Sequence, residues 1–174
     1  MHLDVAARST ATARALGFSL CLAIGTWVLP ASAGASETYD LERLMRAAVR
    51  YPAPRDLQQQ LASRNRQALS ACVAEHRLRD VESFFAAVPI SLSRAESRAF
   101  LVFPTQFCPG FFGGHSIPFW IMESTRNGTY LELLFSAEDA LVIEASQTRG
   151  YRDITTRYGR RSQLHRFNGE TYAQ

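Results

Sequence analysis

The chain has no lysine: all 19 of its basic residues are arginine, set against 16 acidic residues. The net charge of +3 is too small to indicate a nucleic-acid-binding protein. Hydrophobic residues make up 47% of the 174 and charged residues 20%, a composition too apolar for a disordered tail. Outside its N-terminus the chain lacks the long apolar runs of a protein with several membrane spans. The composition therefore indicates a soluble globular protein with room for one domain.

Motifs that carry catalytic chemistry are missing as well. The chain contains no G-x-S-x-G nucleophile elbow, no P-loop and no dinucleotide-binding fingerprint. Beyond the N-terminal segment its histidines are His76, His115 and His165, and none stands at a metal-site spacing from another or from a cysteine. The sequence therefore predicts no cofactor and no metal, and it favours a protein that is not an enzyme. A small hydrolase that uses Asp153 with a histidine is the catalytic alternative.

The first 33 residues have the pattern of a secretory signal peptide. A positively charged start with Arg8 and Arg14 precedes an apolar run over residues 15–29, and a small-x-small motif ends at Ala33. The apolar run is shorter than the roughly 20 residues that a membrane-spanning helix needs. We therefore expect cleavage after Ala33 rather than retention as an N-terminal anchor. A second small-x-small motif ends at Ala35 and is the alternative cleavage position.

Cleavage after Ala33 would leave residues 34–174 as a single domain, periplasmic or secreted. It removes Cys21, so Cys72 and Cys108 remain as the two cysteines of a chain bound for an oxidising compartment. We expect a disulfide between them, which closes a loop of about 36 residues and stabilises the fold by roughly 3 to 4 kcal/mol. The alternative, a reactive thiol, has no C-x-x-C motif to support it.

Hydrophobic spacing indicates two helices within about residues 40–76. A short amphipathic helix follows capping residues in 36–40, and its apolar residues recur every three or four positions: Leu41, Leu44, Met45 and Ala48. Prolines at positions 52 and 54 end that pattern. Asp56 is then expected to cap a longer helix that ends near His76 and carries Cys72 on its apolar stripe.

From about residue 83 to residue 174 the apolar spacing approaches two, which is typical of strands. The expected strands are 83–92, 98–103, 117–123, 129–135, 140–145, 152–158, 163–167 and 171–173. Turn residues separate them, among them Asn127-Gly128 and Asn168-Gly169. The predicted fold is therefore α+β: an antiparallel β-meander of about seven short strands, with the two N-terminal helices packed on one face or one end.

Several segments between residues 83 and 174 form a recognisable pattern. They include residues 90–102, Phe107-Cys108 before a Gly-rich loop, residues 119–121 and 130–134, then Gly150-Tyr151-Arg152-Asp153-Ile154 and Phe167-Asn168-Gly169-Glu170-Thr171-Tyr172. The pattern resembles a class of small exported Gram-negative proteins that end with a Gly-Tyr-x-Asp-Ile segment and an aromatic-x-Gly-x-x-Tyr hairpin. The resemblance implies a β-meander. More loosely, the chain is similar to periplasmic lysozyme inhibitors and to immunity proteins against exported cell-wall hydrolases, a likeness at the level of fold.

One loop departs from this class. Where the loop after the first strands binds Ca²⁺, it supplies several oxygen ligands, chiefly carboxylates, at alternating positions. This chain has Ser91, Ser93, Ala95 and Ser97 there, and Glu96 alone is charged. We therefore predict no calcium at this loop.

Two surfaces are candidates for binding a partner. Residues 149–166 contain six arginines and one acid, so an exposed cluster at Arg160 and Arg161 offers bidentate donors to carboxylates of an acidic partner. The interpretation that we favour over this cluster is that the arginines form cross-strand ion pairs with the acidic residues of 119–145 on a solvated face. The second surface is the loop that contains Phe111, Phe112 and His115, whose aromatic rings would anchor a partner if exposed.

Three classes of function remain. The first is a periplasmic, non-enzymatic binding module, an inhibitor or immunity-like protein that holds another exported protein; it needs no catalytic residues, and we favour it. The second is an envelope-associated structural protein without a soluble partner. The third is the small hydrolase. Neither nucleic acid nor stable membrane insertion after cleavage is expected, and the sequence does not specify an oligomeric state.

Overall fold

A computed structural model describes residues 35–76, 84–93, 97–108 and 116–174. The chain divides into two units, Met1–Ser32 and Ala33–Gln174, and the described residues all lie in the second. The predicted signal peptide therefore lies outside the described residues. Within the part of the chain that the structure describes, no helix combines the length and the apolar character needed to cross a membrane.

The N-terminal part of the domain is helical, as predicted, but with different boundaries. The helical elements are α1 (Leu41–Arg46), the 3₁₀ turn η1 (Ala48–Arg50), α2 (Arg55–Arg64) and α3 (Arg66–His76). Asp40 caps α1, because its side chain accepts a hydrogen bond from the Arg43 backbone N–H at 2.9 Å. The prediction that Asp56 caps the second helix is wrong. Pro54 is the residue before α2, and Asp56 lies in the first turn of that helix.

The longer predicted helix is broken into α2 and α3 at Asn65. The Asn65 side-chain amide and its backbone N–H both donate to the Leu61 carbonyl oxygen, at 2.9 and 3.0 Å. An asparagine side chain that bonds to nearby backbone competes with the regular helical ladder, and this residue type is therefore common at helix ends. The apolar stripe continues across the break: Leu57, Leu61, Leu69 and Cys72 are all fully buried.

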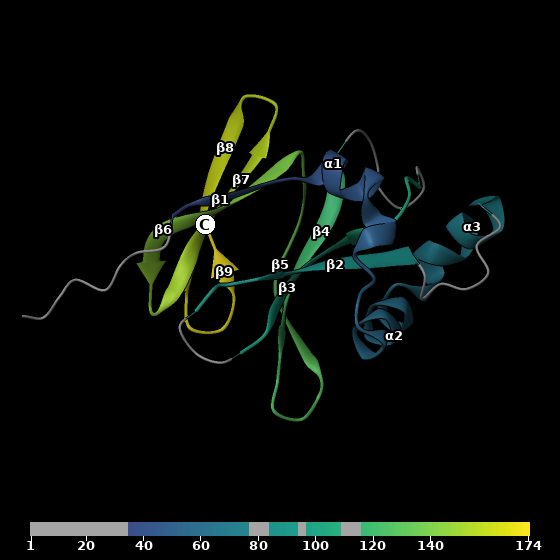
Figure 1. Ribbon diagram of the computed structural model, residues 1–174, viewed down its shortest axis with the longest axis horizontal. Helices are drawn as coiled ribbons and strands as arrows, with labels where there is room; N and C mark the ends of the chain where they lie inside the picture. Colours follow the sequence, from purple (N-terminus) through teal and green to yellow (C-terminus); the bar gives the residue numbers. More distant parts are fainter. Residues whose placement is uncertain (1–34, 77–83, 94–96, 109–115) are drawn as a thin grey trace, which may run out of the picture. The chain divides into compact units, whose positions relative to one another are not determined.

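The remainder of the domain consists of antiparallel strands in two sheets (Figure 1). The four-stranded sheet has the order β2-β3-β4-β5, formed by Phe85–Ile90, Ala99–Pro104, Ile117–Ser124 and Tyr130–Glu138. The five-stranded sheet has the order β1-β6-β7-β8-β9, formed by Glu37–Asp40, Ala140–Thr148, Tyr151–Tyr158, Arg161–Phe167 and Tyr172–Ala173. The described residues thus contain an α+β arrangement that is mostly β.

The single meander of about seven strands differs from this arrangement of nine strands in two sheets within the described residues. Each expected strand span contains a strand, and the additional one is β1, in residues expected only to cap a helix. The chain changes sheet at Asp139, the one residue between β5 and β6. Its backbone N–H donates to the Arg157 carbonyl at 2.8 Å and its carbonyl accepts from Leu41 at 3.1 Å. β6 consequently pairs with β1 and β7 instead of continuing from β5.

Side-chain alternation divides the core into two clusters. From β4, Phe119 and Ile121 join a cluster that also contains Leu141, Ile143 and Ile154 of the five-stranded sheet. The alternate residues Trp120 and Met122 join the second cluster, with the apolar residues of α2 and α3. Successive side chains of a strand point to opposite faces, so both faces of the four-stranded sheet are covered by apolar groups. This double burial explains why every residue of β4 except Ser124 is buried.

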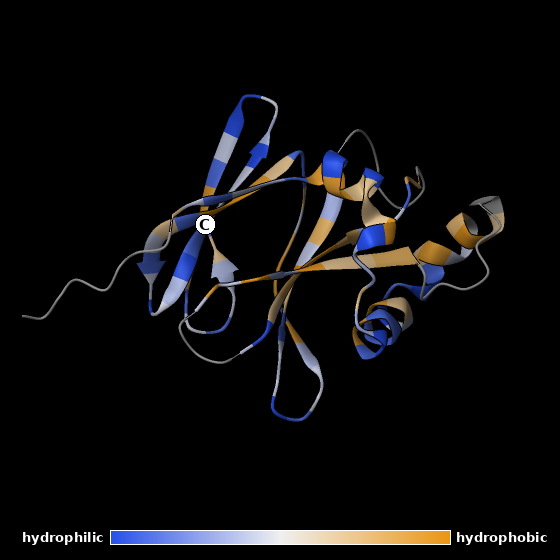
Figure 2. Cartoon of the chain, in the orientation of Figure 1, coloured by the Kyte–Doolittle hydropathy of each residue, from blue (hydrophilic) through white to orange (hydrophobic). Residues whose placement is uncertain are grey.

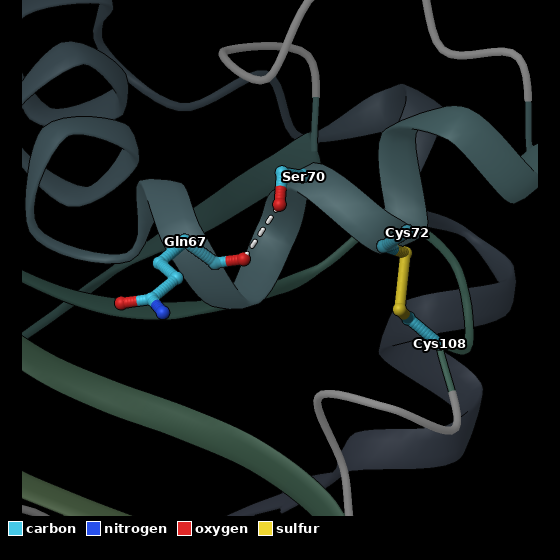
Figure 3. The surroundings of a disulfide bond; sticks show 4 residues. All are labelled: Gln67, Ser70, Cys72 and Cys108. Atoms are coloured by element: carbon cyan, nitrogen blue, oxygen red, sulfur yellow. Dashed lines mark hydrogen bonds between the residues drawn. A yellow bond between two sulfur atoms is a disulfide. The ribbon is translucent and has the colours of Figure 1, made fainter.

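The predicted disulfide is present. Cys72 of α3 is bonded to Cys108, with the two Cα atoms 5.6 Å apart (Figure 3). This separation lies in the usual range for bridged cysteines. Both cysteines are buried in the second core cluster, so the bond ties α3 to the segment that follows β3.

Candidate functional site

The predicted partner-binding residues fall into two groups. Phe111, Phe112 and His115 lie outside the described residues. Arg160 and Arg161 lie at the turn between β7 and β8, and both side chains are exposed. The structure therefore places the arginine cluster at the tip of a hairpin whose outer half is strongly hydrophilic (Figure 2).

The β7–β8 hairpin is closed by a tight turn. Tyr158 pairs with Arg161 in register, with only Gly159 and Arg160 between them. Gly159 has φ 55°, in the left-handed region that tight hairpin turns use and that favours glycine. Its backbone N–H also donates to the Asp139 carboxylate at 2.7 Å. The turn is thereby tied to the corner where the chain passes from one sheet to the other.

The strand register assigns the hairpin side chains to two faces. Thr156 pairs with Gln163 and Tyr158 with Arg161, so these four side chains share one face with His165. Arg157, Leu164 and Arg166 lie on the opposite face, and all three are exposed. Arginines therefore project from both faces and from the turn.

The cross-strand ion pairs between residues 119–145 and the C-terminal arginines are not formed among the described residues. The ion pairs in this part of the chain are Arg46–Glu42, Arg64–Glu132 and Arg152–Glu37. Of the six C-terminal arginines, only Arg152 takes part, and Glu37 is not in the acidic stretch. The predicted pairing is wrong because the strand register sets Arg157 opposite Ala140 and Arg166 opposite Ala173, while Glu37 of β1 supplies the acid for Arg152. Arg157, Arg160, Arg161 and Arg166 have no ion-pair partner within the described ranges.

A cavity of about 590 Å³ lies beside the hairpin, between the two sheets. One wall comes from the hairpin face that carries Thr156, Tyr158, Arg161 and Gln163. The other wall comes from the end of β5 and from the residue that precedes β4. The lining residues are Ser116, Ala137, Glu138, Thr156, Tyr158, Arg161, Ser162 and Gln163. Most of these side chains are polar, and a cavity of this size accommodates a small ligand.

A chain of hydrogen bonds extends from this cavity into the protein. The Glu138 carboxylate accepts from the Ser136 hydroxyl at 3.0 Å and from the Thr156 hydroxyl at 3.4 Å, both on Oε1. Thr156 Oγ1 lies 3.1 Å from Nε2 of His165, which is buried. Burial lowers the pKa of His165 below its ordinary 6.5, although the nearby Glu138 charge opposes this shift. His165 is therefore held toward its neutral form, and Glu138 has no ion-pair partner among the described residues.

Among the described residues, Asp153 and His165 are not placed together as the hydrolase alternative requires. Ile154 is the register partner of His165, so Asp153, the preceding residue, projects to the opposite face of the strand pair. Asp153 Oδ2 instead accepts from the Ser146 hydroxyl at 2.7 Å. Its buried Oδ1 has no hydrogen-bond partner among the described residues. The side chains of His76 and His115 lie outside the described residues.

Sequence reasoning missed the cavity. Its lining comes from the segment before β4 and from β5, β7 and β8, so no local spacing connects Ser116, Glu138 and Thr156. The only local signal is the alternation of polar side chains along Arg161, Gln163 and His165, which predicts one polar strand face.

Within the described ranges, no three His, Cys, Asp or Glu side chains gather as a metal site requires. Comparison of the chain with models of protein families, with curated proteins and with solved structures found no match.

Proposed function

We propose that the chain is exported, loses residues 1–33, and acts in the periplasm as a non-enzymatic binding module for another exported protein. The observation that carries this proposal is the set of exposed arginines on the β7–β8 hairpin without ion-pair partners among the described residues. An arginine without a partner keeps all of its guanidinium donors available for the carboxylates of an acidic protein surface. The resemblance to small exported proteins supports an inhibitor or immunity-like role.

The hairpin suits such a role mechanically as well as electrically. Strand pairing and the Gly159–Asp139 hydrogen bond fix the backbone that carries its arginines, so this backbone need not be ordered when a partner binds. Exposed apolar groups accompany the charges: Tyr158 is 45% exposed and Leu164 is 39% exposed. A partly apolar surface with arginine and tyrosine is typical of protein interfaces.

We further propose that the helices cover one face of the four-stranded sheet and leave the hairpin of the other sheet for the partner. The side chains of α2 and α3 share a core cluster with β2, β3 and β4. Hydrogen bonds from α2 reach Phe85 of β2 and Tyr130 of β5. This division separates the stabilising surface from the binding surface.

The test is capture of envelope proteins by purified residues 34–174. We expect the wild-type domain to retain an exported, acidic protein at a stoichiometric ratio. The double variant Arg160→Gln with Arg161→Gln should retain about tenfold less, since a hydrogen-bonded charged contact contributes about 1.5 kcal/mol or more. Raising the salt concentration should weaken capture by the wild type, because exposed charges are screened.

The matched control is Arg50→Gln with Arg126→Gln, which changes the net charge equally. Both arginines are exposed and lie away from the β7–β8 hairpin. Equal loss of capture in both double variants would show a nonspecific charge effect. Absence of any stoichiometric partner would instead support the envelope-associated structural protein.

A further inference from the structure

The cavity beside the β7–β8 hairpin contains two opposite charges that do not neutralise each other. Arg161 and Glu138 both line it, yet neither takes part in an ion pair among the described residues. Glu138 Oε1 accepts the Ser136 and Thr156 hydroxyls, while Oε2 has no hydrogen-bond partner in the same part of the chain. One carboxylate oxygen and one guanidinium therefore remain available to a ligand.

We propose that this cavity binds a short peptide through its free ends, the terminal carboxylate at Arg161 and the terminal ammonium at Glu138. The site goes beyond the proposed protein-binding function, because it recognises a small ligand. A purely anionic ligand would meet the Glu138 charge, and a purely cationic ligand would meet the Arg161 charge. Only a ligand that carries both charges gains at both places, and a neutral ligand gains at neither.

The hydrogen-bond chain behind Glu138 keeps it suited to an ammonium group. The hydroxyl groups of Ser136 and Thr156 both donate to Oε1, so the carboxylate is held in one orientation. His165 is the last residue of this series of hydrogen bonds. Burial holds it toward its neutral state, so it adds no competing positive charge. The carboxylate is thereby oriented in advance of binding, which reduces the cost of ordering it.

The strand geometry sets the size of the ligand. Glu138 accepts a hydrogen bond from Thr156 of β7. Arg161 is the register partner of Tyr158, which lies two residues further along β7. Two residues of a strand span roughly 7 Å, which is also the length of about two extended peptide residues. The volume of about 590 Å³ leaves room for the side chains of such a peptide. The hydroxyl and amide groups of Ser116 and Gln163 can meet its backbone groups.

The experiment measures binding of four related probes to residues 34–174 at pH 7 by calorimetry and by NMR shift changes. The probes are Ala-Ala, N-acetyl-Ala-Ala, Ala-Ala amide and N-acetyl-Ala-Ala amide, which are zwitterionic, anionic, cationic and neutral. We expect Ala-Ala to bind at least about tenfold more tightly than the neutral probe, since it adds two charged contacts.

Variants assign each end of the peptide to its residue. Glu138→Gln should remove the preference for Ala-Ala over N-acetyl-Ala-Ala, and Arg161→Gln should remove the preference over Ala-Ala amide. The control Arg126→Gln, in an exposed turn between β4 and β5, should preserve both preferences. The NMR shift changes should centre on Glu138, Thr156 and Arg161.

Several outcomes overturn the proposal. One is the absence of Ala-Ala binding up to about 10 mM, a concentration that reveals millimolar affinity. Another is equal binding of all four probes, and a third is an unchanged probe preference in Glu138→Gln. If peptide binding fails while capture of an exported protein succeeds, this inference is wrong and the proposed function stands.

Discussion

Arg152 shows how one buried charge can organise several segments. Its side chain is 9% exposed and forms an ion pair with Glu37 of β1. It also donates to the carbonyl oxygens of Ala35 at 2.7 Å, Glu144 at 2.8 Å and Ile143 at 3.0 Å. Since a buried charge is tolerated only when its donors are satisfied, these contacts stabilise the residues that supply them. Arg152 therefore holds the start of the domain against β6 and β7.

Glu37 makes this contact sensitive to acid. Partial burial by itself would raise its pKa, but hydrogen bonds from Arg152 and Tyr39 and the charge of Arg152 outweigh it, and the pKa lies below the ordinary 4.5. A carboxylate with a depressed folded-state pKa contributes stability that is fully present above its unfolded pKa. That contribution is lost as the pH falls through the folded pKa.

We expect Glu37→Gln to lower the free energy of unfolding by about 1 kcal/mol at pH 7, a modest value because the Glu37 side chain is 44% exposed. The difference from wild type should shrink as the pH falls below about 4.5. Urea unfolding at pH 7, pH 4.5 and pH 3 measures this trend. Glu170→Gln, at an exposed position, is the control, and a difference that stays constant with pH would contradict the account.

Tyr151 provides a second residue-scale connection, between the two sheets. Its hydroxyl donates to the Glu123 carboxylate of β4, with oxygens at 2.9 and 3.0 Å. Burial, together with the hydrogen bond to Glu123 and its negative charge, raises the pKa of Tyr151 to about 12. The hydroxyl is therefore protonated at neutral pH, where it can donate to Glu123.

At the scale of elements, α2 forms hydrogen bonds to the first residue of β5, which is an edge strand of the four-stranded sheet. β5 is the last strand of the four-stranded sheet, and open edges invite pairing with other chains. The Gln60 side chain accepts from the Tyr130 N–H at 3.0 Å and donates to the Tyr130 carbonyl at 2.7 Å. The Tyr130 hydroxyl also donates to Asp56 at 3.1 Å. One amide side chain thus takes the place of a neighbouring strand at this residue.

We expect Gln60→Leu to lower the free energy of unfolding by about 1 to 3 kcal/mol, because it leaves both polar backbone groups of Tyr130 without their partner. Gln59→Leu is the matched control, since this exposed glutamine is on the same helix. Urea unfolding measures the stability, and hydrogen exchange of the Tyr130 amide measures the local opening. Equal effects of the two substitutions would show that the amide contacts of Gln60 do not stabilise the edge.

At the scale of the whole domain, the disulfide connects parts that the sheets alone do not join. Cys72 and Cys108 are separated by 36 residues, and the loop they close includes β2 and β3. On the chain-entropy account, a loop of this length makes the unfolded state less favourable by about 4 kcal/mol. This contribution is a large fraction of the stability of a small domain.

We expect the double variant Cys72→Ser with Cys108→Ser to lose about 3 to 4 kcal/mol of unfolding free energy. Wild-type protein in excess reductant should lose a similar amount, which separates the missing bond from the substitution itself. Urea unfolding, with mass spectrometry to confirm the bonded state, makes both measurements. Free thiols at both positions in oxidised periplasmic material would contradict the bond itself.

The local features of this domain could be predicted from the order of residues along the chain. The period-two spacing predicted the strands from β2 to β9, and the helical spacing predicted α1 and the apolar stripe with Cys72. Cysteine pairing followed from elimination once Cys21 was assigned to the signal peptide. These predictions succeeded because alternation, turn residues and cysteine number act through near neighbours or through few alternatives.

The tertiary structure alone determined how these pieces combine. Local spacing does not encode the turn from one sheet to the other at Asp139, the insertion of β1 beside β6, or the pairing of Arg152 with Glu37. The same holds for the cavity, which is lined by Glu138 of one sheet and Arg161 of the other. The amino-acid sequence by itself predicted most of the strand and helix segments, because side-chain periodicity and turn residues are local signals. Only packing decided which charges are neutralised and which remain free, because that depends on contacts between residues far apart in the chain.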